Sequence, residues 1–122
     1  MANVALAGGV FHRWIWKPYQ AGTFKSGASG RTVALVKAGL AGTFAAKQLN
    51  DAKTNVMSDP ALCKVLYQPL NDLTSKISGL KGRLASGDTT AITDAESAVT
   101  SLKSVASQQG MPVTEDENAS IG

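Results

Sequence analysis

The clearest pattern of hydrophobic and polar positions lies between residues 60 and 85. Apolar side chains recur there at intervals of four and three residues, which is the heptad spacing of a helix that packs along another helix. We call these positions the leucine seam: Leu66, Leu70, Leu73, Ile77, Leu80 and Leu84. Ser58 or Asp59 is suited to cap this helix, with Pro60 as its first residue. Pro69 interrupts the pattern, so we expect a bend or a restart near it.

A second helical pattern precedes the seam and runs from about Arg31 or Thr32 to Val56. Its larger apolar residues recur at helical spacing, and we expect them to supply core side chains: Val33, Val36, Leu40, Phe44 and Leu49. Four small residues are spaced by four along another face: Ala34, Ala38, Gly42 and Ala46. Because small side chains let a neighbouring helix approach closely, this face predicts close helix packing.

A third helical pattern follows the leucine seam and is again spaced by three and four residues. Its apolar positions are Ile92, Ala95, Val99, Leu102 and Ala106. Asp88 or Thr89 is suited to cap it, and Gly110 with Pro112 is expected to end it. Three such helices joined by short turns predict an all-α fold, a small antiparallel three-helix bundle over residues 31–110.

The regions on either side of this bundle have a different character. We expect residues 1–30 to form an apolar, aromatic and basic arm that is extended or short-helical, and the Gly- and Ser-rich stretch 20–30 is typical of a flexible connection. Residues 111–122 are acidic and polar, so we expect this tail to be disordered. The predicted bundle is small, and its core would gain from self-association or from packing against a partner.

Residues 11–20, FHRWIWKPYQ, hold four of the seven aromatic residues of the chain. The residues expected to bind a membrane or a partner are Phe11, Arg13, Trp14, Trp16, Lys17 and Tyr19. Trp and Tyr beside cations suit the headgroup region of a membrane, but they also suit stacking on single-stranded nucleic acid. As a third alternative, the segment folds over the bundle and supplies its missing large side chains. The apolar, uncharged run from Val4 that precedes it favours the membrane, and it also resembles the end of a spanning helix.

Charge is distributed unevenly along the chain, although the net charge is only +3. Residues 1–50 carry six Lys or Arg and no Asp or Glu, whereas residues 85–122 carry six acidic residues and Lys103. A basic first half favours anionic lipid, nucleic acid or an acidic protein surface as the partner.

The residues that most enzymes need are scarce in this sequence. One cysteine, Cys63, excludes a disulfide within the chain, and one histidine, His12, leaves no His or Cys cluster for a metal. The Gly pairs in GASG and GLAG lack the setting of a phosphate-binding loop. We therefore expect no catalytic residues, no metal, no cofactor and no small-molecule substrate.

These patterns together predict a non-enzymatic structural or interaction module at a membrane or cell envelope, with secretion as an alternative location. We expect it to pair with itself or with another protein through the leucine seam and the small face of the first helix. Two alternatives remain open. One is a subunit of a larger viral or secreted assembly that docks by its N-terminal arm. The other is a bundle that binds nucleic acid or an acidic protein.

Overall fold

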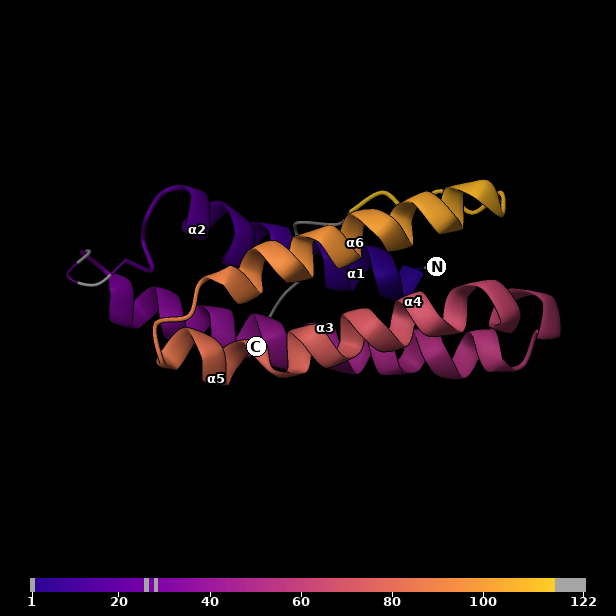
Figure 1. Cartoon of the computed structure of the whole chain (residues 1–122), viewed down its shortest axis with the longest axis horizontal. Coiled ribbons are helices and arrows are strands. Elements are labelled where there is room, and N and C mark those ends of the chain that lie inside the picture. Colours follow the sequence, from indigo (N-terminus) through magenta and orange to yellow (C-terminus); the bar gives the residue numbers. More distant parts are fainter. Residues whose placement is uncertain (1, 26, 28, 116–122) are drawn as a thin grey trace.

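A computed structural model describes residues 2–25, 27 and 29–115 of the chain (Figure 1). Within these residues the regular structure is helical throughout, with no strand, which confirms the all-α prediction. The helical elements are α1 (Ala2–Phe11), the π-turn η1 (His12–Trp16), α2 (Lys17–Gln20), α3 (Arg31–Met57), α4 (Pro60–Ser78), α5 (Leu80–Ala85) and α6 (Thr90–Gln108).

The four main helices pack as an antiparallel bundle in which neighbours in sequence are neighbours in space. Helix α1 lies along α3, α3 lies along α4, and α4 lies along α6 (Figure 1). Successive long helices run in opposite directions, which is the up-down-up-down topology that short connections favour. The expected count of three helices is not confirmed, because α1 packs against α3 as a fourth.

Helix α4 begins as the sequence predicts and continues where a break was expected. The Asp59 carboxylate accepts hydrogen bonds from the backbone N–H groups of Ala61 and Leu62, and Pro60 is the first helical residue. The restart expected near Pro69 does not occur, since α4 runs on to Ser78. Leu66 and Leu70, on either side of Pro69, are fully buried, and this packing holds the helix together across the proline. The break lies at Gly79, between α4 and α5.

The core combines large side chains, mainly from α1 and α4, with many small ones from α3 and α6. Helices α1 and α4 contribute mainly Phe, Leu, Ile and Val, whereas α3 and α6 each bury four alanines beside a few larger residues. The buried residues of α3 are Ala38, Gly39, Ala41, Gly42, Ala45, Leu49, Ala52 and Val56. Small residues facing large ones let the helices approach closely without leaving a cavity.

The larger apolar residues near the start of α3 therefore face outward, contrary to the expectation that they fill the core. Val33 is 58 % exposed, Val36 is 60 % exposed and Leu40 is 47 % exposed. Phe44 is only partly buried, and the rings that fill the core are Phe11 and Phe24.

The connection before α3 and the segment after α6 are both anchored on the bundle. Phe24 is buried, and its carbonyl oxygen accepts a hydrogen bond from Nε of Arg31 at 3.1 Å. Met111 and Val113 pack against the core after α6 has ended at Gln108. The predicted flexibility at residues 26 and 28, and the predicted disorder at residues 116–122, lie outside the described residues.

Candidate functional site

The aromatic–basic segment lies on a helix that changes its hydrogen-bonding pattern at η1. The π-turn follows α1 directly and leads into α2, so residues 2–20 are helical from end to end. Phe11 and Ile15 point into the core and are fully buried, whereas Arg13 and Lys17 are exposed. A π-turn widens the helix locally and is frequent at functional sites. Along this segment the apolar side chains Phe11 and Ile15 face inward, and the cations Arg13 and Lys17 face outward.

An open groove of about 630 Å³ lies between this segment and the first turns of α3. We call it the basic–aromatic groove. Its lining residues are Arg13, Trp14, Lys17, Pro18, Ala21, Thr23, Gly30, Val33, Ala34 and Lys37. Three of them are cationic and none is acidic. The groove therefore joins positive charge to an aromatic and aliphatic wall.

Two of the cations in the groove converge on the ring of Trp14. The guanidinium carbon of Arg13 lies 4.6 Å from the ring centroid, and Nζ of Lys37 lies 5.2 Å from it. Both distances are those of cation–π contacts, which hold positive charge over the face of the indole. Nε1 of Trp14 is buried and has no hydrogen-bond partner among the described residues.

An exposed apolar surface borders the groove on α3. We call Val33, Val36 and Leu40 the α3 apolar stripe, because their spacing of three and four residues places them on one helix face. Val33 belongs to the stripe and also lines the groove. A cationic groove thus lies directly beside apolar side chains that the bundle leaves uncovered.

The other predicted binding residues of the N-terminal segment are divided between the core and the surface. Phe11 is buried in the core, while Trp14, Trp16 and Tyr19 are partly buried and pack against it. The rings of Trp16 and Tyr19 lie beside each other, with centroids 5.7 Å apart and planes inclined at 35°. The segment is thus folded onto the bundle, and its outward face is formed chiefly by its cations.

The leucine seam lies inside the chain. All six of its residues are buried, packed among residues of α1, α3 and α6. On the small face of α3, Ala38 and Gly42 are buried, while Ala34 and Ala46 are partly exposed. A Cβ atom at Gly42 would lie 3.8 Å from the carbonyl oxygen of Ile77, which shows how closely α3 approaches α4. The leucine seam is thus covered within one chain, and the small face of α3 is covered in part.

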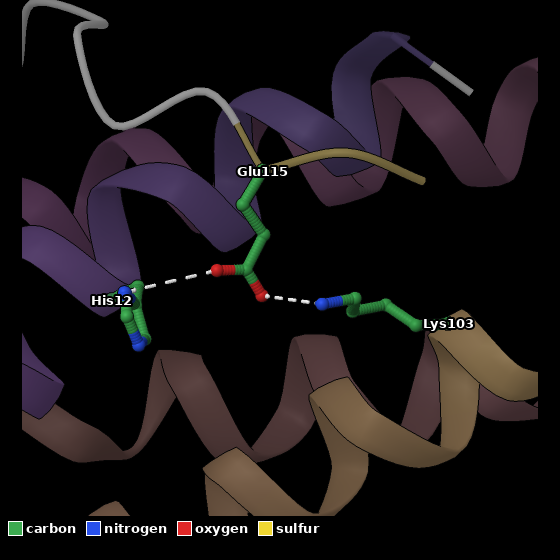
Figure 2. Close-up of polar contacts among 3 residues, drawn as sticks. All are labelled: His12, Lys103 and Glu115. Atoms are coloured by element: carbon green, nitrogen blue, oxygen red, sulfur yellow. Dashed lines mark hydrogen bonds and ion pairs between the residues drawn. The ribbon is translucent and has the colours of Figure 1, made fainter. Parts of the chain in front are cut away.

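A separate polar cluster fastens the residues after α6 to the bundle (Figure 2). Lys103 Nζ donates a hydrogen bond to Glu115 Oε1 at 3.3 Å, and His12 Nδ1 lies 3.9 Å from Glu115 Oε2. The aliphatic part of Glu115 crosses Gly8 so closely that a Cβ atom there would lie 3.2 Å from it. The only histidine of the chain is therefore part of a contact between η1 and the segment that follows α6.

Beside this cluster lies the carboxyl group of Glu96 on α6, whose surroundings disfavour a negative charge. Burial raises the pKa of Glu96, the Glu115 carboxylate raises it further, and His12 and Lys103 oppose the shift. Its Oε2 atom is buried with no hydrogen-bond partner among the described residues. The ionised form of Glu96 is therefore disfavoured in the folded chain.

We expect Glu96→Gln to stabilise the protein at neutral pH and to have less effect in acid. A carboxyl whose folded pKa is raised stabilises the fold below its ordinary pKa of 4.5, and this contribution is lost as the pH rises through the raised value. Glutamine has no such pH dependence. Urea unfolding at about pH 7 and about pH 4 measures the difference. A gain in stability of equal size at both pH values would contradict the prediction.

The described residues give no positive support for a metal site or for a membrane-spanning helix. Within residues 2–25, 27 and 29–115, no group of three or more His, Cys, Asp or Glu side chains is placed to hold a metal ion. Over the same residues, no helix combines the length and the hydropathy needed to cross a bilayer.

Comparison of the chain with family models, with curated proteins and with solved structures finds no match.

Proposed function

We propose that the protein is a non-enzymatic helical bundle that attaches to the surface of an anionic membrane. The attachment site is the end of the bundle that carries the basic–aromatic groove and the α3 apolar stripe. The observation that supports this most directly is their contiguity, since Val33 belongs to both. Cations that meet lipid headgroups beside apolar side chains that enter the acyl boundary are the two components of interfacial binding.

The amounts of charge and apolar surface are suited to reversible attachment. Each Lys or Arg near an anionic surface contributes about 1 kcal/mol, and three cations line the groove. The three stripe residues add apolar area that the fold itself does not use. No catalytic role is included in the proposal, because the sequence has a single histidine and a single cysteine.

A nucleic acid or an acidic protein would use the same cations but would leave the α3 apolar stripe without a role. Docking on a neighbouring subunit of an assembly would use the stripe but would not require a groove lined by three cations. Membrane attachment accounts for both features, and for this reason we favour it.

Flotation with vesicles tests the proposal, and α3 offers a matched pair of variants for it. Val36 lies in the stripe and is 60 % exposed, whereas Met57 lies at the opposite end of α3 and is 61 % exposed. We expect Val36→Glu to weaken binding to anionic vesicles by roughly tenfold or more, through lost apolar contact and added repulsion. Met57→Glu makes the same change in charge at the other end and is expected to bind like the wild type.

The salt dependence of flotation separates the alternatives. Binding of the wild type to anionic vesicles that persists in part at high salt supports insertion of the stripe. The proposal is wrong if the wild type does not float with anionic vesicles at low salt, or if both variants lose binding equally.

A further inference from the structure

The basic–aromatic groove has the size and lining of a site for one small molecule. Its volume of about 630 Å³ lies within the range of ligand pockets, which is roughly 300–1,000 Å³. A surface that only attracted a membrane by charge would need no concave site. The groove is instead a shallow, open concavity lined by residues of η1, α2, the connection after α2 and α3.

The two kinds of lining residue specify the class of ligand. Arg13, Lys17 and Lys37 favour an anion, and no carboxylate lines the groove within the described part of the chain. Trp14, Pro18 and Val33 supply apolar contact beside these cations. A ligand that satisfies both must carry a negative charge and an apolar part on the same molecule.

The position of the groove indicates where the apolar part of the ligand goes. Val33 continues from the groove wall into the α3 apolar stripe, toward Val36 and Leu40. Lys37 lies one helical turn after Val33 and is held over the Trp14 ring. If the anionic group of a ligand lay near Lys37, the apolar chains attached to it would lie along the α3 apolar stripe. This is the surface that faces the bilayer in the proposed function.

We propose that the groove binds the headgroup and first chain carbons of one anionic phospholipid. This inference rests on the proposed function, and it adds to surface attachment a defined site with one lipid per chain. The phosphate occupies the cationic wall and the chains follow the apolar stripe.

Titration with a short-chain lipid that stays monomeric in water tests the site apart from any membrane. The probe is dihexanoyl phosphatidylglycerol below its micelle concentration, with tryptophan fluorescence and calorimetry as readouts. We expect saturable binding of one molecule per chain, weakened roughly fivefold by Lys37→Gln. Lys47→Gln removes the same charge from an exposed position further along α3 and is expected to bind like the wild type.

Two further ligands identify the source of the anion. Inorganic phosphate has no apolar part, and we expect it to bind much more weakly than the lipid. Phosphatidylcholine with the same chains has no net charge, and we expect little binding. Phosphate binding as tight as that of the lipid would overturn the proposal in favour of a free-phosphate site.

The flotation and titration results distinguish failure of the site from failure of the proposed function. Flotation with anionic vesicles, without saturable binding of the monomeric lipid, overturns the headgroup site and leaves surface attachment in place. Saturable binding of the monomeric lipid without flotation supports the headgroup site and shows that the proposed attachment to a membrane surface is wrong.

Discussion

Replacing Phe11 with alanine is expected to lower the free energy of unfolding by about 3–5 kcal/mol. The ring of Phe11 is fully buried where α1 passes into η1, among the side chains of the common core. Its removal loses apolar burial and leaves a cavity that the tightly packed bundle cannot fill. Since small domains unfold with about 5–15 kcal/mol in total, this single change removes a large part of the stability.

Phe44→Ala is the control for the loss of a ring at a less buried position. Phe44 is only partly buried on α3, so we expect a clearly smaller loss of stability than at Phe11. Urea unfolding followed by circular dichroism measures both variants. A Phe11→Ala variant as stable as the wild type would show that residues 2–20 behave as an arm separate from the bundle.

The existence of α3, α4 and α6 could be predicted from the sequence, because the local capping signals and the hydrophobic periodicity agree in these three helices. The Asp59–Pro60 start of α4 and the end of α6 before Gly110 lie where capping residues and Gly predicted them. The leucine seam is apolar on one helix face only, so spacing predicted that this face is covered, but it did not show whether the covering helices belong to the same chain or to a second one.

Helix α1 lacks the signal that revealed the other helices. Residues 2–11 contain no charged side chain, so they show no polar face from which a helical period could be recognised. The π-turn at His12–Trp16 then shifts the register, so the pattern on one side of it does not continue at the same spacing on the other. Segment 1–20 was therefore interpreted from its composition, which indicates chemistry more readily than packing.

The candidate site could be anticipated only in part for a similar reason. Arg13, Trp14 and Lys17 stood out as an aromatic–basic cluster, but Lys37 and the α3 apolar stripe did not. Helix α3 presents large apolar residues on one face and small ones on another, and either face could have been the inner one. The choice was decided by the large side chains of α1 and α4, which leave room only for small ones opposite them.

The same packing argument leads to the second large effect, at Leu70. This residue of the leucine seam is fully buried in the core of one chain. We expect Leu70→Ala to lower the free energy of unfolding by about 2–5 kcal/mol. Val36→Ala shortens an exposed side chain of α3 and is expected to change stability by about 0.5 kcal/mol or less.

Protein concentration distinguishes this role of Leu70 from a role in pairing two chains. If the seam joined two copies, folding would be linked to association, and the melting temperature of the wild type would rise with concentration. A seam that packs within one chain gives a melting temperature that does not depend on concentration, and Leu70→Ala lowers it equally at every concentration. Melting curves over a hundredfold range of concentration, with light scattering for mass, therefore test whether Leu70 contributes to the core of one chain or to an interface between two.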